Sequence, residues 1–468
     1  MGWELLTLDC LVHVFSYLEA PDLLRAARVN KAWNEAADTA SLWKRMCLDH
    51  WTFCNISNMT PGMQTWKKYY LHRSKLEHQM ASGQPSADYT CLAMRGHKGK
   101  IVAMAYLSDN EHVFGAGKLR SVICTASTDG TIRAWQVQEG TQIWSSSIQE
   151  VPFVKVIAVP QYKLAISTDA RGTIKAWHGD TGEELATFST SLSSSRLVTF
   201  SVNNKHFLAA ATSGGTIYTL EIPNLSQVSF ITALQNSSID LLLCSPDKRW
   251  LIAGSTENAD TSPKILYTDC LINPTDEPPI SSSLPVNKCA VVCWLPKAAA
   301  RIAIMHKDHV SAQMTITVFD LAIKKSKYKM EVVAQQVASF TLSGTWSTNI
   351  LMEGKGTETL LLGCGSQLKL YSVFGIQLEA FQDHNNTISS IWVDSFHVVT
   401  SSWDLSLRVY TWKKVNKISS LTSRYQLLGG SHRWSRGFTD VACDDVSIVG
   451  VVDETDGTSI LRAYSFNL

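Results

Sequence analysis

The spacing of hydrophobic residues changes once along the chain, from a helical period before residue 89 to a period of two after it. In residues 4–48 the apolar positions recur every three or four residues, which indicates short helices with one buried face. The first group of these positions is Leu8, Leu11, Val12, Phe15 and Leu18. A second group is Leu23, Leu24, Ala27, Val29 and Trp33, and a third is Leu42, Trp43 and Met46.

Individual residues mark where these helices begin and end. Pro21 ends the first helix and suits the first turn of the second, where Asp22 is favourable at the positive end of the helix. Asp38 or Ser41 is expected to cap the last helix. A module of roughly 45 residues buries little apolar area by itself. It therefore either needs a partner over its exposed apolar side chains or packs as a small cap on the larger domain.

A loop and a further helix follow this module. Residues 50–64 are rich in Asn, Ser and Thr and contain Pro61 and Gly62, which predicts a loop. Residues 64–79 predict a helix in which aromatic residues alternate with basic ones. A basic aromatic helix of this kind binds nucleic acid or calmodulin in some proteins and is a spacer with one packed face in others. Residues 81–86 break the helix and mark a domain boundary.

From residue 89 on, short runs rich in β-forming residues predict strands, as at 101–106 and 122–125. The most regular unit joins Gly96-His97 to the stretch 125–135 and resembles a WD repeat, with Ala134-Trp135-Gln136 at the usual Trp-Asp position. In such a repeat, His97, Thr125 (or Ser127), Asp129 and Trp135 satisfy one another's hydrogen bonds within one blade. Asp129-Gly130 predicts the tight turn between two strands.

Degenerate copies of this unit recur at about 40–55-residue spacing. They lie at residues 168–177, 213–218, 264–267, 316–320, 367–371, 400–410 and 457–464. Together with the first unit they provide about eight third strands, which favours an eight-bladed propeller. The alternative is seven blades with an irregular insertion near residues 274–279. Residues 89–94 are expected to close the ring by joining the last blade, since propellers protect their edges in this way.

Two of the copies differ from the first in an informative way. In the copy that ends at Tyr410, the tyrosine takes the tryptophan's place and its hydroxyl is still a hydrogen-bonding partner. In the copy that ends at Trp177, Arg171 stands where Asp129 stands in the first, so that turn must be stabilised differently. The residues expected to hold the blades together are His97, Thr125, Asp129, Trp135, Trp177, His384, Thr400, Asp404 and Tyr410.

Residues 6–43 resemble the F-box of the F-box/WD-repeat proteins. The resemblance rests on Phe15-Ser16-Tyr17-Leu18, Asp22-Leu23-Leu24, Ala27-Arg28-Val29-Asn30-Lys31-Ala32-Trp33 and Leu42-Trp43. The family opens with Leu-Pro, whereas here Leu6 is followed by Thr7. The resemblance implies docking onto the Skp-type adaptor of a cullin–RING ubiquitin ligase. The implied adaptor contacts are Leu6, Leu8, Val14, Phe15, Leu18, Pro21, Leu23, Leu24, Val29, Trp33 and Trp43.

The expected fold is therefore an α+β multidomain chain. It consists of an all-α F-box in residues 1–48, a loop and linker helix in 49–88, and an all-β WD-repeat propeller in 89–468. The resemblance implies that this chain is the substrate-recognition subunit of an SCF-type ubiquitin ligase, without an active site of its own. The alternative is an interaction scaffold that has lost its coupling to the ligase or that uses it outside degradation.

The composition argues against several classes of binding partner. The formal net charge of +1 over 468 residues argues against a nucleic-acid-binding domain with a strong basic field. No run of about 18 uncharged apolar residues appears, so no membrane span is expected. The eleven cysteines are scattered and form no Cys-x-x-Cys pair, which predicts reduced thiols and no zinc site. Glu4 and Asp9 make a poor secretory signal, and we expect a cytoplasmic protein, with the nucleus as a second compartment.

No catalytic motif or cofactor site is predicted. The chain lacks a phosphate loop, a Gly-x-Ser-x-Gly motif and a His-Glu-x-x-His motif. His306, Asp308 and His309 form a short cluster whose spacing indicates a solvated turn.

The candidate target-binding face carries Thr128, Arg171 and Trp403. In related ubiquitin-ligase propellers the residue before the turn aspartate is often an arginine that binds a phosphate. Here Thr128 and Trp403 occupy that position, so a phosphate-binding pattern is not supported. Trp403 is either an exposed anchor for a target or, as we favour, packed on the neighbouring blade.

Overall fold

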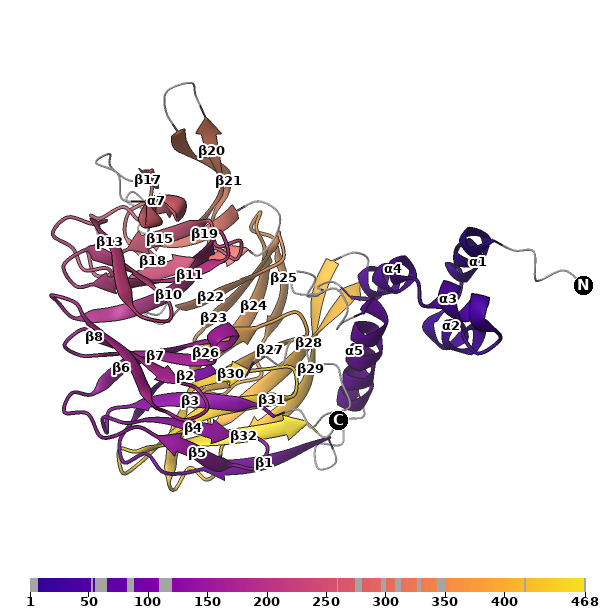
Figure 1. Ribbon diagram of the computed structural model, residues 1–468, viewed down its shortest axis with the longest axis horizontal. Helices are drawn as coiled ribbons and strands as arrows, with labels where there is room; N and C mark the ends of the chain where they lie inside the picture. The colour runs from indigo at the N-terminus through magenta and orange to yellow at the C-terminus, as the bar shows by residue number, and fades with distance from the viewer. Residues whose placement is uncertain are drawn as a thin grey trace, which may run out of the picture.

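The computed structural model describes residues 7–51, 54, 65–81, 88–108, 120–258, 260–273, 280–295, 300–307, 313–325, 330–342, 350–415 and 418–466. Within these ranges a small group of helices precedes a large β-propeller (Figure 1). The first helices lie at one side of the propeller, and the helix closest in sequence to the strands lies against it. The expected α+β organisation is confirmed.

The described residues of the N-terminal part include five helices. They are α1 (Leu8–Phe15), α2 (Ala20–Ala26), α3 (Lys31–Ala37), α4 (Ala40–His50) and α5 (Trp66–Ala81). Thr7 precedes α1 and its hydroxyl accepts a hydrogen bond from the Cys10 amide at 3.4 Å. Asn30 caps α3 by accepting from the Trp33 amide at 2.9 Å, and Pro21 lies in the first turn of α2 as expected.

The prediction that Asp38 or Ser41 caps α4 was wrong. Thr39 precedes this helix and makes no capping hydrogen bond with its side chain. Asp38 instead ends α3 and forms an ion pair of 2.5 Å with Lys67 Nζ of α5. The carboxylate thus joins two helices rather than starting one, because the chain passes from α3 to α4 in only two residues.

The rest of the chain forms eight four-stranded antiparallel sheets, each one blade of the propeller. Blade 1 holds β2 (Ile101–Tyr106), β3 (Val122–Ser127), β4 (Ile132–Gln136) and β5 (Thr141–Ser145). Blade 2 holds β6 (Phe153–Val159), β7 (Leu164–Asp169), β8 (Thr173–His178) and β9 (Glu184–Ser189), with a 3₁₀ turn at Pro160–Tyr162. Blade 3 holds β10 (Ser194–Val202), β11 (Lys205–Thr212), β12 (Thr216–Glu221) and β13 (Ser226–Thr232).

The next three blades repeat this order. Blade 4 holds β14 (Leu241–Cys244), β15 (Trp250–Gly254), β16 (Lys264–Tyr267) and β17 (Ser281–Ser283), with the short helix α7 (Asp269–Ile272). Blade 5 holds β18 (Cys289–Leu295), β19 (Ala300–Lys307), β20 (Met314–Lys325) and β21 (Met330–Thr341). Blade 6 holds β22 (Ile350–Lys355), β23 (Thr359–Cys364), β24 (Gln367–Ser372) and β25 (Gln377–Phe381).

The last two blades end the ring. Blade 7 holds β26 (Ile388–Val393), β27 (His397–Ser402), β28 (Ser406–Val415) and β29 (Ile418–Leu428). Blade 8 holds β30 (Ser435–Cys443), β31 (Ser447–Glu454) and β32 (Ser459–Phe466), and its fourth strand is β1 (Tyr89–Met94). Every repeat copy found in the sequence supplies the third strand of its blade, so the eight-bladed prediction is confirmed over the seven-bladed one. The proposed insertion at 274–279 lies outside the described residues.

The ring closes as expected, by pairing the two ends of the propeller sequence. Tyr89 lies opposite Phe466 and Met94 opposite Leu461 in an antiparallel register without a bulge. Met94 is fully buried, together with residues of blades 1 and 8. Closure therefore removes the free edge that β32 would otherwise expose.

The linker helix α5 is packed onto the propeller. Leu76 and Met80 are buried in one cluster with Phe396, Tyr425 and Tyr464 of blades 7 and 8. The Lys414 ammonium donates to the Leu48 carbonyl at 3.0 Å, which ties α4 to β28 as well. This packing agrees with the interpretation of residues 64–79 as a spacer helix with one packed face. No helix within the described ranges has the length and apolar character needed to cross a membrane.

The two faces of the propeller differ because successive turns of an antiparallel sheet lie at opposite ends of its strands. The turn from β26 to β27 contacts α5, and we call this side the helix-side face. The turns from the second to the third strand lie on the opposite side, which we call the far face. Loops from the fourth strand of one blade to the first strand of the next also reach the far face.

Candidate functional site

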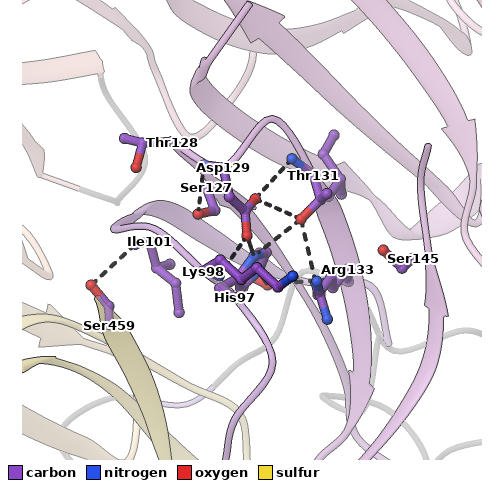
Figure 2. Close-up of polar contacts among 12 residues, drawn as sticks. His97, Lys98, Ile101, Ser127, Thr128, Asp129, Thr131, Arg133, Ser145 and Ser459 are labelled. Atoms are coloured by element: carbon purple, nitrogen blue, oxygen red, sulfur yellow. Dashed lines mark hydrogen bonds and ion pairs between the residues drawn. The ribbon is translucent and has the colours of Figure 1, made fainter. Parts of the chain in front are cut away.

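The polar chain of blade 1 lies beneath the far face (Figure 2). His97 Nδ1 lies 3.0 Å from Asp129 Oδ2, and His97 Nε2 lies 2.8 Å from Thr125 Oγ1. The Trp135 indole N–H donates to the same Thr125 oxygen at 2.9 Å. Asp129 also accepts from the Thr131 hydroxyl at 2.6 Å and from the Lys98 amide at 2.9 Å. Thr125 takes part in the chain, whereas Ser127 only accepts from the Asp129 amide at 3.2 Å.

The hydrogens of this chain have one consistent arrangement. An indole N–H can only donate and a carboxylate can only accept. Neutral His97 therefore donates through Nδ1 to Asp129 and accepts through Nε2 from the Thr125 hydroxyl. Burial lowers the pKa of His97, which favours this neutral form. Burial by itself would raise the pKa of Asp129, but hydrogen bonds from Thr131, Lys98 and His97 outweigh it and hold the pKa at about 2.

Blade 7 repeats the chain with one change. His384 Nδ1 lies 3.1 Å from Asp404 Oδ2, and His384 Nε2 lies 2.8 Å from Thr400 Oγ1. The hydroxyl of Tyr410 donates to Asp383 Oδ2 at 3.0 Å. The tyrosine thus connects the polar residues of blade 7 to a second carboxylate, that of Asp383. In blade 1 the Trp135 indole donates to Thr125 instead.

Blade 2 shows how a turn without the usual aspartate is held. Trp177 Nε1 donates to Ser167 Oγ at 2.8 Å. Asp169 lies two residues before Arg171, and its Oδ1 accepts from the amides of Arg171 at 2.9 Å and Thr173 at 2.8 Å. The side chain of Asp169 therefore does for this turn what Asp129 does for the turn of blade 1.

The predicted target-contact residues lie on the far face but differ in exposure. Thr128 and Arg171 are exposed, whereas Trp403 is half-buried. A Cβ on Gly437 of β30 would lie 2.7 Å from Trp403 Cε3, so the indole packs directly on the backbone of the next blade. Trp403 is thus packed on its neighbour, as favoured from the sequence, and is a structural residue.

Another tryptophan on the far face was missed by the sequence analysis. Trp434 lies in the loop from blade 7 to blade 8 and is 61% exposed. The Arg433 guanidinium lies 5.2 Å from the centre of the Trp434 ring. The backbone carbonyl of Trp434 accepts a hydrogen bond from the Thr455 amide at 2.9 Å. Ile148 and Leu192, in the loops that follow blades 1 and 2, are also exposed on this face. The signal for Trp434 was its position after Gly429-Gly430 and between two arginines.

The predicted adaptor contacts fall into two groups in the structure. Leu8, Val14 and Val29 are 45%, 51% and 59% exposed, and Pro21 is exposed as well. Tyr17, which the prediction left out, is 76% exposed. Leu18, Leu24 and Trp33 are half-buried. Leu6 lies outside the described residues.

The other three predicted contacts lie in the interior of the module. Phe15, Leu23 and Trp43 are almost completely buried, and the Trp43 indole donates to the Ala37 carbonyl at 2.7 Å. Their side chains form the core of the module together with α1 to α4. The prediction of direct contact is corrected here, because a helical module this small uses its largest apolar residues to hold its own helices together.

A cavity of about 420 Å³ opens beside these helices. Leu18 and Pro21 of the α1–α2 region, Met46 of α4 and Tyr70 of α5 line it together with several charged side chains. Arg45 pairs with Asp49 at 3.5 Å and His50 with Glu77 at 3.6 Å around its rim. The cavity joins the helical module to the linker helix, so a partner seated there contacts both.

Arg73 forms the joint between the helices and the propeller. Its side chain is 4% exposed and donates to the Tyr69 hydroxyl at 2.9 Å and to the Ser395 carbonyl at 2.7 Å. The guanidinium also stacks on Trp51, 4.6 Å from the ring centre. One side chain thus connects the end of α4, the middle of α5 and the β26–β27 turn.

The predicted cluster near His306 is resolved only in part. His306 Nε2 lies 2.9 Å from Thr317 Oγ1 of the neighbouring strand. Asp308 and His309 lie outside the described residues. Within the part of the chain that the structure describes, no group of three or more His, Cys, Asp or Glu side chains could hold a metal ion.

Comparison with known proteins gives the same organisation. A family model described as F-box-like matches residues 8–49, and a model described as WD domain, G-beta repeat matches residues 88–136. The human F-box/WD repeat-containing protein 12 is 34% identical over 98% of this chain and 98% of its own length. The mouse F-box/WD repeat-containing protein 15 is 27% identical over 98% of this chain and 99% of its own.

More distant matches cover parts of the chain. The probable E3 ubiquitin ligase complex SCF subunit sconB of Arthroderma benhamiae is 24% identical over 28% of this chain and 22% of its own length. Among solved structures, the computationally designed Ika8 protein covers 79% of this chain and 98% of its own, with a TM-score of 0.56 and 18% identity. That likeness shows the propeller fold. The relation to the human protein over the whole length shows the family, and the chain belongs to the F-box/WD repeat-containing proteins.

Proposed function

We propose that this protein is the substrate-recognition subunit of an SCF-type ubiquitin ligase. The F-box binds a Skp-type adaptor and, through it, the cullin and the RING protein. The propeller binds a target protein on its far face. Support comes from the family and from the distant relative named as an SCF subunit.

The observation that carries the adaptor half of the proposal is the exposure of apolar side chains on a module whose core is already complete. Leu8, Val14, Tyr17 and Val29 remain in solvent while Phe15, Leu23 and Trp43 fill the interior. Exposed large apolar residues gathered on so few helices are typical of a surface that a partner covers. These side chains are therefore the proposed adaptor contacts.

Co-purification tests this half. Val14→Asp and Val29→Asp should each greatly weaken recovery of the Skp-type adaptor and the cullin, because a charge would be desolvated in the interface. The matched control is Ile376→Asp, which changes an apolar propeller side chain with 63% exposure. Recovery of adaptor and cullin with both module variants at the wild-type level would contradict the interface. Failure of the wild-type chain to recover either would contradict the ligase proposal.

The target half rests on the separation of the two faces. Arg73 fixes the helices to the helix-side face, which leaves the far face free of the chain's own helices. Among the described residues, Trp434 is the largest apolar side chain exposed there, and exposed tryptophans are frequent interface anchors. Ile148 and Leu192 provide further apolar contacts along the same face.

The target half has its own matched pair of variants. Trp434→Ala should reduce the ubiquitination and turnover of the bound target by about tenfold or more, as expected for an interface anchor. Phe230→Ala removes another aromatic side chain with the same 61% exposure, from the outer strand β13, and should leave turnover unchanged. Equal effects of the two variants would argue against the far face as the binding surface.

We further propose that the chain has no active site of its own and that catalysis comes from proximity to a charged carrier enzyme. The thiol chemistry is consistent with this. Burial raises the pKa of Cys47, Cys124 and Cys289 to about 12, so these thiols stay protonated and are poor nucleophiles. If the target binds but does not accumulate when the protein is depleted, the chain acts as a scaffold outside degradation.

A further inference from the structure

The centre of the propeller contains a cavity that neither interaction surface uses. It has a volume of about 350 Å³ and lies among the first strands of four neighbouring blades. β14 contributes Leu243, β18 contributes Val291 to Trp294, β22 contributes Leu351 to Glu353, and β26 contributes Ser390 and Ile391. The walls are thus mainly apolar, and Glu353 is the one carboxylate among the lining residues.

The backbone of blade 6 sets the direction of Glu353. A Cβ on the next residue, Gly354, would lie 2.4 Å from the Trp294 carbonyl oxygen, so that position faces β18 directly. Because side chains alternate along a strand, Glu353 points away from β18 and toward the cavity that it lines. Glu353 is exposed to solvent within this cavity.

Glu353 has no counter-charge among the described residues. No hydrogen bond or ion pair of its carboxylate is found there, and two lysines on first strands, Lys155 of β6 in blade 2 and Lys355 of β22 itself, interact with other groups. Lys155 interacts with Asp440, which also accepts from the Ser390 hydroxyl at 2.8 Å. Lys355 lies 3.4 Å from Ser395 Oγ and interacts with Asp394. The apolar cavity therefore contains one negative charge that the protein does not compensate.

We propose that this cavity binds a primary alkylammonium group, presented by a partner as a lysine side chain or as a free amino terminus. The apolar walls suit the methylene chain, and the carboxylate suits the charged end. Binding would compensate the charge of Glu353. This site is separate from the far-face surface around Trp434.

The choice of ammonium over guanidinium follows from the supply of acceptors. A guanidinium carries five N–H donors in a fixed plane, and an ammonium carries three that rotate freely. Among the lining side chains only Glu353 and Ser390 carry oxygen, and the Ser390 hydroxyl already donates to Asp440. The few side-chain acceptors in the lining suit the three donors of an ammonium better than the five of a guanidinium.

The proposal predicts a specific pH dependence. Burial in the centre of the ring raises the pKa of Glu353 to about 7. Below that pH the carboxyl becomes neutral while an alkylammonium stays charged, so binding weakens as the pH falls. The other titratable side chain lining the cavity is Cys293, whose pKa burial raises further, so its thiol stays neutral. The neighbouring strand β26 carries no titratable residue.

The test uses the full chain and n-butylammonium as the probe, with n-butanol as its neutral isostere. Saturation-transfer NMR should show saturable binding of the ammonium, weaker binding of the alcohol, and roughly tenfold weaker ammonium binding to Glu353→Gln. Glu379→Gln, a change in blade 6 outside the cavity, is the matched control and should bind as the wild type does. Equal binding to wild type and Glu353→Gln, or no binding to the wild type, would overturn the proposal.

Two further measurements complete the test. If Glu353→Gln does not fold, the wild-type affinity between about pH 5.5 and about pH 8.5 decides, and a pH-independent affinity would overturn the proposal. An N-acetylated peptide with one lysine and an unblocked peptide without lysine then separate the two sources of the ammonium. Preferential binding of either peptide identifies the source, and binding of neither would overturn the proposal for protein partners.

Discussion

At the scale of single residues, the polar chain of blade 1 couples stability to pH. The folded chain holds the pKa of Asp129 at about 2, below its ordinary value of 3.8. A carboxyl with a lowered pKa stabilises the folded state above the ordinary pKa, and this contribution is lost as the pH falls toward the folded value. The difference corresponds to roughly 2 kcal/mol at neutral pH.

Asp129→Asn should therefore lower the free energy of unfolding by roughly 2 kcal/mol at pH 7. The gap between wild type and variant should shrink as the pH falls from about 4 to about 2.5, because the wild-type carboxyl then protonates. Urea unfolding at several pH values measures both free energies. Asp180→Asn, at an exposed pair with Lys163, is the control. A gap that stays constant with pH would show that Asp129 acts by packing alone.

The residues that the sequence predicted correctly are those whose environment is local. His97, Thr125, Asp129 and Trp135 are fixed by one Asp-Gly turn and by the spacing of adjacent strands, which are visible in the sequence. Trp403 and Trp434 show the opposite case. Trp403 is covered by the backbone at Gly437 of the next blade, whereas Trp434 lies exposed in the loop between blades 7 and 8. The exposure of each tryptophan therefore follows from tertiary packing that no local sequence pattern encodes.

At the scale of elements, the linker helix α5 is the part whose packing the sequence could not specify. The resemblance to the F-box/WD-repeat proteins favoured a spacer with one packed face, and Tyr69, Arg73, Leu76 and Met80 are indeed buried. The partner of Arg73, the Ser395 carbonyl, is 322 residues away along the chain. A basic residue in a helical pattern gives no indication of such a distant acceptor, and the basic residues of this helix left nucleic-acid or calmodulin binding as the less favoured alternative.

Arg73→Ala should loosen the joint between the helices and the propeller. The variant leaves the Ser395 carbonyl and the Tyr69 hydroxyl without their donor and removes the stack on Trp51, at a cost of roughly 3 kcal/mol or more. We expect earlier tryptic cleavage within α5, after Lys67 or Lys68, and a wider distribution of distances between spin labels on α1 and on blade 7. Lys75→Ala, an exposed basic residue on the same helix, should change neither measurement. Unchanged distances in Arg73→Ala would mean that Leu76 and Met80 suffice for the joint.

At the scale of the whole molecule, closure of the ring by β1 makes the two ends of the propeller sequence interdependent. The sequence predicted this pairing because an open propeller would expose a strand edge. It also predicted eight blades, since each third strand carries a recognisable pattern even where the polar chain is lost. What the repeats could not give is the cavity at the centre, because its walls come from first strands that share no motif.

The closing strand should be worth more to stability than its length suggests. Met94→Ala removes a buried side chain where blades 8 and 1 meet, and we expect a loss of about 2–5 kcal/mol in the free energy of unfolding. Met330→Ala makes the same change at an exposed position on the outer strand β21 and should cost about 0.5 kcal/mol or less. Chemical denaturation followed by tryptophan fluorescence and by circular dichroism measures both. Coincident transitions are expected, since a closed ring unfolds as one unit, and an early separate transition in Met94→Ala would show that blade 8 opens independently of the rest.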